Sequence, residues 1–280
     1  MKYEVNDMPE MPEVETVKEA LKKKLINKKI TKVDIFYNNI IEYPNIDLFK
    51  KKIKKETIID ITRRGKWLIF HLNDFYLLSH LRMEGKYFFK TKEDLISSHE
   101  HIIFTLDNKE ELRYHDTRKF GRMYLLEKEK LLTQKPLINL GLEPFDINLT
   151  KSYLKNKLNN KTKPIKTSLL DQTIIAGIGN IYVDEILFLS KISPIRKSNN
   201  LSDKELDNII KNTKKILSNA IKAGGTTIRS YMSSDKLTGN YQYQLLIHTK
   251  EHQPCPYCKK PITKIQVGGR GTYYCNNCQK

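Results

Sequence analysis

The sequence predicts an α+β protein with several domains: an N-terminal β-sandwich with a flanking helix, a helical second domain, and a terminal zinc-binding β-hairpin. Three observations lead to this prediction. Short segments rich in Ile, Phe, Tyr, Leu and Thr, separated by turn residues, fill the region from Lys29 to Glu127. Segments with helical periodicity and capping residues follow that region. All 4 cysteines lie close to the C-terminus.

The first expected element is a helix that begins just after Pro9-Glu10. Pro12 suits the first helical turn, where a missing N–H costs no hydrogen bond. Acidic residues in that turn and lysines in the last turn match the helix dipole. The apolar positions that recur on one helical face are Val14, Val17, Leu21 and Leu25. Taken alone, the Pro9-Glu10 dipeptide is an ordinary helix start.

The next region is expected to form strands. Turn signals such as Arg64-Gly65, Asn73-Asp74 and Asp107-Asn108 separate its apolar runs. Many short strands without intervening helices favour a two-layer β-sandwich or a barrel, with the first helix packed against it. The expected strand segments are Lys29–Tyr37, Thr57–Leu72, Phe75–Lys90, His101–Leu106 and Glu111–Leu126.

The following part of the chain is expected to be helical. A linker at residues 139–150 leads into a polar stretch, after which helices begin. Ser202 and Glu205 form a capping box ahead of a long amphipathic helix, and Gly224-Gly225 ends this helix. A shorter helix is expected at Asn180–Leu189. The helical prediction therefore depends on local caps as well as on periodicity.

The cysteines have the spacing of a zinc site. The pattern Cys-x2-Cys-x16-Cys-x2-Cys is formed by Cys255, Cys258, Cys275 and Cys278. Four thiolate ligands leave no open coordination position, so one structural Zn2+ is expected rather than a catalytic metal. Disulfides are the alternative, which a cytosolic chain disfavours. By itself, such a hairpin is equally compatible with a role in stabilising the fold and with a role as a binding module.

Charge and hydropathy narrow the class of protein. The 280 residues include 50 Lys or Arg and 32 Asp or Glu, a net charge of +18, which favours a polyanionic partner such as nucleic acid. A generally lysine-rich composition is the alternative explanation. No apolar run reaches membrane-spanning length, and Met1–Asp7 lacks the apolar core of a secretory signal. A cytoplasmic protein is therefore expected.

The start of the chain suggests a specific chemistry. If Met8 is the true initiator and is removed, Pro9 carries a free secondary amine, which titrates near ~8 and is partly nucleophilic at neutral pH. Such an amine can attack a sugar carbon and form an imine, with Glu10 beside it to move protons. While Met1–Asp7 precedes it, the Pro9 nitrogen is an inert tertiary amide. We therefore expect residues 1–7 to come from a misassigned upstream start codon.

The stretch Met8-Pro-Glu-Met-Pro-Glu-Val-Glu-Thr16 resembles the amino terminus of formamidopyrimidine-DNA glycosylases. The resemblance extends to Lys280 through separated motifs in the same order. It implies a bifunctional DNA glycosylase and abasic-site lyase for oxidised purines (8-oxoguanine and formamidopyrimidines), with Pro9 as nucleophile and Glu10 in proton transfer. It also implies duplex DNA containing a lesion or abasic site as partner, no small-molecule cofactor, and a bacterial monomer associated with the nucleoid through DNA.

The same resemblance assigns roles to residues of the β-rich region. Lys66, in the stretch Arg-Arg-Gly-Lys, would reach the active site, although most lysines in such turns are solvated. His80 would contact a phosphate. Met83, Arg118 and Phe120 would together fill the space that an extruded nucleotide leaves in the stack. By residue type alone, Met83 and Phe120 are more often core residues, and Arg118 is more often a surface charge.

In the second domain, the turn Ala-Gly-Ile-Gly179 and the helix after it are similar to the family's helix-two-turn-helix signature. Without that context, the turn is an ordinary interhelical connection with Asn180 as N-cap. The resemblance implies that Asn180 and Arg270 hold a phosphate together. On a weaker local match, Lys166 would reach the base or its phosphate. His248 is a departure, because the related proteins usually have a phosphate-contacting tyrosine there.

The expected domains are a 1–7 extension, a catalytic β-sandwich at 8–138, a linker at 139–150, a helix-two-turn-helix DNA-binding domain at 151–245 and a zinc hairpin at 246–280. By resemblance, the loop between Gly225 and Tyr243 would close over the damaged purine, with bent DNA between the domains. Two alternatives remain. One is a glycosylase of the endonuclease VIII type, which acts on oxidised pyrimidines. The other is a non-catalytic nucleic-acid-binding zinc protein, if residues 1–7 are retained.

Overall fold

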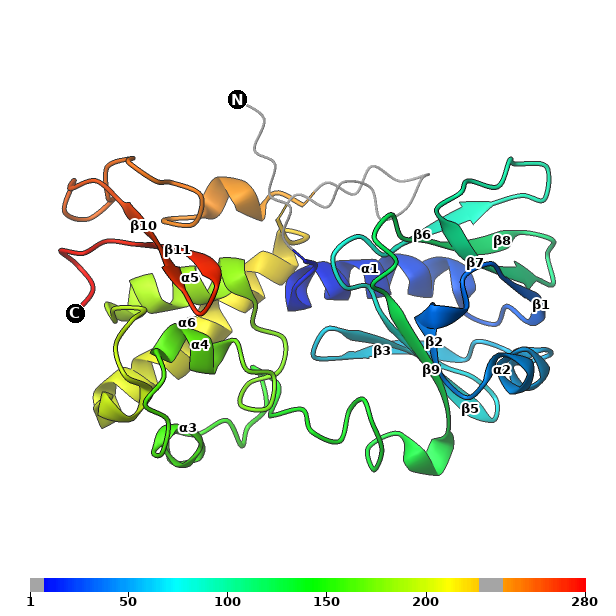
Figure 1. The fold of residues 1–280 in the computed structure, drawn as a ribbon, viewed down its shortest axis with the longest axis horizontal. Helices are drawn as coiled ribbons and strands as arrows, with labels where there is room; N and C mark the ends of the chain where they lie inside the picture. Colours follow the sequence, from blue (N-terminus) through cyan, green and yellow to red (C-terminus); the bar gives the residue numbers. More distant parts are fainter. Residues whose placement is uncertain (1–7, 227–238) are drawn as a thin grey trace. The chain divides into compact units, whose positions relative to one another are not determined.

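The structure is a computed structural model that describes residues 8–226 and 239–280. The chain divides into two compact units, Met1–Ile138 with Thr226–Gly239, and Asn139–Gly225 with Asn240–Lys280. Among the residues that the structure describes, the first unit contains two sheets and two α-helices. The second combines helices with the terminal hairpin (Figure 1). The α+β fold class expected from the sequence is confirmed. Within the described residues, no helix combines the length and the apolar character that crossing a bilayer needs.

The first unit is a β-sandwich rather than a barrel. One sheet has the order β1-β7-β8-β6 and the other the order β2-β9-β5-β4-β3. Val14 and Leu21 of α1 share one core with Leu68 of the second sheet and Ile102 of the first. The elements are α1 (Met11–Leu25), β1 (Ile30–Ile35), η1 (Asn38–Ile40), β2 (Ile41–Tyr43), α2 (Ile46–Ile53), β3 (Asp60–Arg64), β4 (Trp67–His71), β5 (Phe75–His80), β6 (Lys86–Lys90), β7 (Glu100–Leu106), β8 (Glu111–His115), β9 (Arg122–Glu127) and η2 (Lys128–Lys130).

Helix α2 corrects the expectation that no helix interrupts the strands. Asn45 caps α2 by accepting a hydrogen bond from the backbone N–H of Leu48 at 3.0 Å. Phe49 and Ile53, one helical turn apart, are both fully buried in the shared core. Only these two positions of the short helix are buried, and lysines follow Phe49 directly. The apolar periodicity is therefore too brief to stand out in the sequence.

The second unit contains helices and a two-stranded hairpin. Its long helix begins at the expected capping box, in which the backbone N–H of Ser202 donates to Glu205 Oε2 at 2.7 Å. The N-cap of the shorter helix is Gly179, and Asn180 is its first helical residue. The elements are α3 (Lys151–Leu158), α4 (Ile165–Leu169), α5 (Asn180–Ser190), η3 (Ser198–Asn200), α6 (Asp203–Lys222), η4 (Tyr241–Gln244), β10 (Thr263–Val267) and β11 (Arg270–Tyr274).

Candidate functional site

Pro9 and Glu10 lie at the start of α1, and both are buried. Glu10 is the N-cap; its backbone N–H donates to Glu13 Oε2 at 3.0 Å, while its side chain accepts from the backbone N–H of Glu13. Glu13 Oε1 also accepts from the backbone N–H of Thr226 at 2.8 Å. This reciprocal capping holds the Glu10 carboxylate in a defined position beside Pro9.

Arg63 connects α1 to the turn that carries Lys66. Its Nε donates to Glu15 Oε2 at 2.8 Å, and its Nη1 donates to the carbonyl of Gly65 at 2.7 Å. Gly65 and Lys66 form the two-residue turn between β3 and β4, and Gly65 has the positive φ of 58° that such hairpins require. Lys66 is only 5% exposed. Since Glu15 follows the start of α1 closely, Arg63 brings this turn to the Pro9 end of the helix.

Strand register places the other candidates of this unit at the same end of the five-stranded sheet. Trp67 pairs with His80, and His80 pairs with Arg122. The turn before β4, the loop after β5 and the loop before β9 therefore leave the sheet side by side. The second of these connections carries Met83 and the third carries Phe120. The tertiary structure thus gathers residues that are far apart in the sequence.

His80 is arranged as a neutral hydrogen-bond donor. Its Nδ1 accepts the backbone N–H of Arg82 at 3.0 Å, so the neutral ring carries its proton on Nε2. Burial, with a smaller contribution from the positive charges of Arg82 and Lys66, holds the pKa of His80 well below its usual value. At neutral pH the ring can therefore offer one N–H to an anionic oxygen, but no positive charge.

Met83 and the pair Arg118–Phe120 are not core residues in the structure. Phe120 is 46% exposed, and the guanidinium carbon of Arg118 lies 5.0 Å from the centroid of its ring. Arg118 is exposed and Met83 is half-buried. Side chains of this kind at loop tips are available for contact with a partner. The alternative in which Met83 and Phe120 are ordinary core residues does not describe these positions.

In the second unit, Asn180 contacts the hairpin that carries Arg270. The turn between β10 and β11 consists of Gly268 and Gly269, whose φ angles of 57° and 74° suit a tight two-residue hairpin. Arg270 follows this turn and is exposed. Asn180 Nδ2 donates to the carbonyl of Gly271 at 3.2 Å, so the first residue of α5 contacts the strand residue next to Arg270. The exposed guanidinium of Arg270 offers N–H donors that suit an anionic oxygen.

Lys166 is buried within the second unit, where the sequence prediction had it reaching a base or phosphate. Its ammonium group is fully buried and donates to Asp184 Oδ1 at 2.8 Å, Thr272 Oγ1 at 2.8 Å and the carbonyl of Gly271 at 3.0 Å. The placement corrects the expectation of direct contact, because all three acceptors are part of the protein. Lys166 instead supports the strand that presents Arg270.

Replacing Lys166 with Met should lower the free energy of unfolding by about 3–5 kcal/mol, because it leaves the Asp184 carboxylate buried without its cation. Chemical denaturation of the zinc-loaded protein measures this change. Lys163→Met is the matched control, since the ion pair of Lys163 with Asp171 is partly solvated and should contribute at most ~1 kcal/mol. Equal losses for the two variants would show that the buried pair is not a major support of this unit.

Asp184, Glu185 and His248 form a buried hydrogen-bond network that was not predicted from the sequence. Glu185 accepts the backbone N–H groups of Leu246, Ile247 and His248, each at 2.9 Å. Asp184 Oδ2 accepts from the backbone N–H of Tyr273 at 3.1 Å and lies 2.9 Å from His248 Nδ1. The sequence feature that could have revealed this network is the pair of adjacent acidic residues in an otherwise apolar helix, because buried charges need partners.

His248 therefore differs from the surface tyrosine that the family resemblance suggested. Its side chain is 2% exposed, and its ring packs edge-on against Tyr273 with the centroids 4.9 Å apart. The ring is held inside the unit by Asp184, so a phosphate contact at this position is not supported. Its interactions instead join α5 to the hairpin strand β11.

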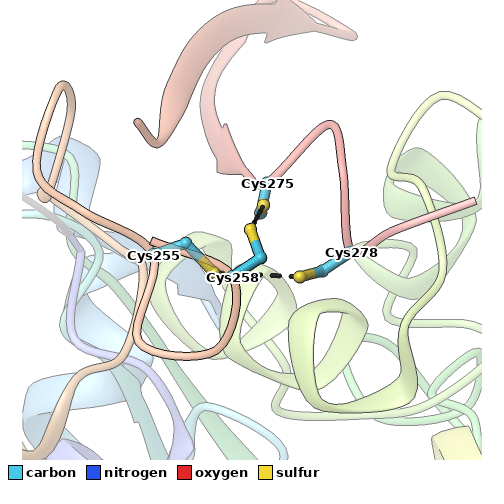
Figure 2. Close-up of side chains that lie close together, drawn as sticks. All are labelled: Cys255, Cys258, Cys275 and Cys278. Carbon is cyan, nitrogen blue, oxygen red and sulfur yellow. Dashed lines mark hydrogen bonds between the residues drawn. The ribbon is translucent and has the colours of Figure 1, made fainter. Parts of the chain in front are cut away.

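The four cysteines converge at the base of the hairpin (Figure 2). Their sulfur atoms all lie within 4.8 Å of one another. The Cys255–Cys278 and Cys258–Cys275 separations are 3.9 and 3.4 Å, close to the ~3.8 Å that a tetrahedral zinc site implies. The geometry fits one structural zinc ion, as expected.

Comparison with known families agrees with this architecture along nearly the whole chain. Residues 8–123 match the formamidopyrimidine-DNA glycosylase N-terminal domain, and residues 140–232 match the H2TH domain of the same enzymes. Residues 253–280 match the zinc finger found in FPG and IleRS. The fold and its sites thus define a DNA glycosylase of the zinc-finger, helix-two-turn-helix class.

Individual relatives specify the family. The formamidopyrimidine-DNA glycosylases of Oceanobacillus iheyensis and Bacillus subtilis are both 45% identical over 273 residues, which cover 97% of this chain and 98% and 99% of those proteins. The chain belongs to the formamidopyrimidine-DNA glycosylase family.

Solved structures from Lactococcus lactis are similar throughout. An FPG mutant in complex with Fapy-dG-containing DNA has a TM-score of 0.91 at 39% identity, and Fpg with abasic-site DNA has 0.90 at 38%. A complex of the wild-type enzyme with DNA containing an oxidized pyrimidine has a TM-score of 0.89 at 38% identity. Each comparison covers 97% of this chain and 100% of the other.

Proposed function

We propose that this protein removes oxidised purines from duplex DNA and then cleaves the strand at the abasic site. The observation that carries the proposal is the arrangement at the start of α1. There Pro9 and Glu10 are buried together, and Arg63 ties the helix to the turn of Lys66. An amine, a carboxylate and an ammonium group at one end of the unit suit imine chemistry on a deoxyribose.

In the proposed reaction, the Pro9 nitrogen bonds to C1′ of the damaged nucleotide as the bond from C1′ to the base breaks. The departing base keeps the bonding electrons and takes a proton. Glu10 protonates the sugar ring oxygen, so that the ring opens to an iminium ion, and later exchanges a proton with C2′. Loss of that C2′ proton expels the 3′ phosphate by β-elimination, and a second elimination expels the 5′ phosphate. The charge of Lys66 would favour an unprotonated Pro9 amine and assist departure of the base.

The nucleophile requires that Pro9 be the first residue of the active chain. We propose that residues 1–7 and Met8 are absent from that form. One observation supports this: the match to the family's N-terminal domain begins at residue 8. Proline after Met8 favours removal of the methionine, whereas Lys2 after Met1 does not. Intact mass of the natively expressed protein tests the proposal, and a mass that includes Met1–Met8 in active enzyme would end it.

Candidate contacts with DNA come from both units. In the first unit, His80 would bind a phosphate, while Met83, Arg118 and Phe120 would fill the space of the extruded nucleotide. In the second unit, Asn180 and Arg270 would hold a flanking phosphate. The loop expected to close over the purine falls largely in residues 227–238, outside the described residues.

Arg270→Ala should weaken binding to all DNA sequences alike, since a phosphate contact carries no base information. It should also reduce the slope of log Kd against log salt by about 1, the value for one lost phosphate contact. Fluorescence anisotropy over a series of salt concentrations measures both quantities. Lys259→Ala, which removes another exposed charge of the zinc finger, is the control. An unchanged slope for Arg270→Ala would remove this residue from the phosphate contacts.

Strand cleavage tests the proposed specificity. Duplexes with one 8-oxoguanine should be cut faster than duplexes with one thymine glycol. The reverse preference would favour the alternative function, an endonuclease VIII-type activity on oxidised pyrimidines. That alternative is included because a structural relative has been solved with DNA containing an oxidized pyrimidine. Absence of both cleavage and borohydride trapping on abasic DNA would instead indicate a non-catalytic DNA-binding protein.

A further inference from the structure

Two loops of the first unit rest on the same buried phenol. The loop with Met83 ends at Gly85, and the loop with Phe120 ends at Gly121. A Cβ atom at Gly85 would lie 2.3 Å from the Tyr114 hydroxyl oxygen, and one at Gly121 would lie 1.8 Å from it. Only a residue without a side chain can approach this closely. The backbones of both loops therefore lie directly against Tyr114.

Tyr114 is a rigid support for these loops. It lies on β8, is fully buried, and packs edge-on against the ring of Tyr87, its partner on β6, with the centroids 5.3 Å apart. The Tyr87 hydroxyl donates to Ser79 Oγ at 2.7 Å, a hydrogen bond that includes neither Tyr114 nor the two loops. Burial raises the pKa of Tyr114 well above its usual value, so the phenol keeps its proton.

Asp116 holds the loop with Phe120 through hydrogen bonds to the loop backbone. Its carboxylate is fully buried; Oδ1 accepts the backbone N–H of Arg118 at 3.0 Å, and Oδ2 accepts that of Gly121 at 2.8 Å. The Tyr114 hydroxyl donates to Oδ2 at 3.5 Å, a long contact. The main chain of Asp116 is also fixed, because its carbonyl accepts from the backbone N–H of Lys119 at 3.3 Å. One carboxylate thus binds the backbone on both sides of Phe120.

We propose that Tyr114 and Asp116 are positioning residues that hold Met83, Arg118 and Phe120 as one preorganised wedge. The inference rests on the proposed function, because the wedge has a task only if a nucleotide is extruded. Phe120 is 46% exposed, so packing of its ring contributes little to fixing its loop in the free protein, and other contacts must hold the loop. Asp116 supplies these contacts to the loop with Phe120. Tyr114 contacts this loop and the loop with Met83, and so aligns the two.

The test separates extrusion from the chemistry that follows. Asp116→Asn keeps the size of the side chain but can no longer accept both backbone N–H groups, and Tyr114→Phe removes the hydroxyl that both loops contact. Tyr87→Phe is the matched control, because it also removes a buried hydroxyl from the same core, but one that bonds Ser79 instead of the loops. Single-turnover excision of 8-oxoguanine from duplex DNA should fall roughly tenfold to a hundredfold in Asp116→Asn and several-fold in Tyr114→Phe.

A second reaction shows whether the defect is specific. Borohydride trapping on a single-stranded abasic oligonucleotide needs no wedge, so both variants should stay within about twofold of the wild type. A parallel loss in this reaction would overturn the proposal, since it would indicate general damage to the fold. Excision by both variants at the rate of Tyr87→Phe would also overturn it.

A third measurement is independent of catalysis. In a duplex with 2-aminopurine opposite a tetrahydrofuran abasic analogue, saturating wild-type protein should raise the fluorescence as the wedge separates the bases. The rise should be less than half as large with Asp116→Asn, and unchanged with Tyr87→Phe. Equal rises for all three proteins would overturn the proposal. If wild-type protein gives this rise without forming an adduct on abasic DNA, the proposed chemistry fails while the positioning role stands.

Discussion

A chain that begins at Pro9 should form a borohydride-stable adduct with abasic DNA, and a chain that retains Met1–Met8 should form none. The physical reason is electronic: the nitrogen of a terminal proline is a basic secondary amine, whereas the same nitrogen in a peptide bond has its lone pair delocalised into the carbonyl group. Denaturing electrophoresis of the reduced reaction measures the adduct. Intact mass of each preparation establishes which chain start is present.

The control is binding without chemistry. Both forms should bind a tetrahydrofuran abasic analogue if the extra residues block only the nucleophile. An adduct formed by a chain of verified full mass would contradict the role of Pro9 and would require another amine. If the longer form fails to bind the analogue as well, the added residues also obstruct DNA, and the comparison must then be made with Pro9 acetylated in the shorter form.

Glu10→Gln should reduce excision by roughly 10²–10⁴-fold, the usual contribution of a proton-transfer group. The fold should persist, because a glutamine oxygen can still accept the backbone N–H of Glu13 and the backbone N–H of Glu10 is unchanged. Single-turnover excision measures the rate, and thermal unfolding checks the fold. The substitution therefore isolates proton transfer from helix capping.

Glu19→Gln on the same helix is the matched control, since the Glu19 side chain is 56% exposed and lies outside the helix start. It should leave excision unchanged. A Glu10→Gln rate within about threefold of this control would exclude Glu10 as the principal proton-transfer residue. In that event, Glu13 would be the next residue to examine, because its carboxylate binds the backbone of Glu10 and of Thr226.

Elements with a local signal were predictable from the sequence. The start of α1 after Pro9-Glu10 and the capping box of α6 depend on residues within one or two turns, and both are present. The four cysteines likewise lie close together in the sequence, so the zinc hairpin could be predicted from their spacing. Helix α2 escaped prediction because a short helix with only two buried positions, Phe49 and Ile53, shows almost no periodicity.

Residues whose role depends on distant partners were predicted less well. Lys166 is a cation in the sequence, and only the fold shows that it is buried against Thr272, 106 positions away. His248 and Asp184, 64 positions apart, form another such pair. Arg63 looked like one more basic residue of its motif, yet its contacts with Glu15 and Gly65 bring Lys66 to the Pro9 end of α1.

The sequence alone determined the order of the folded units, the helix that starts beside Pro9 and the zinc ligands, because each of these is specified by neighbours along the chain. The candidate site residues came instead from the resemblance to a known family. The tertiary structure alone decided which charges are buried, and it showed that Tyr114 and Asp116 support two loops at once. Burial and long-range hydrogen bonds follow from how the strands and helices pack, and no local spacing of residues encodes that packing.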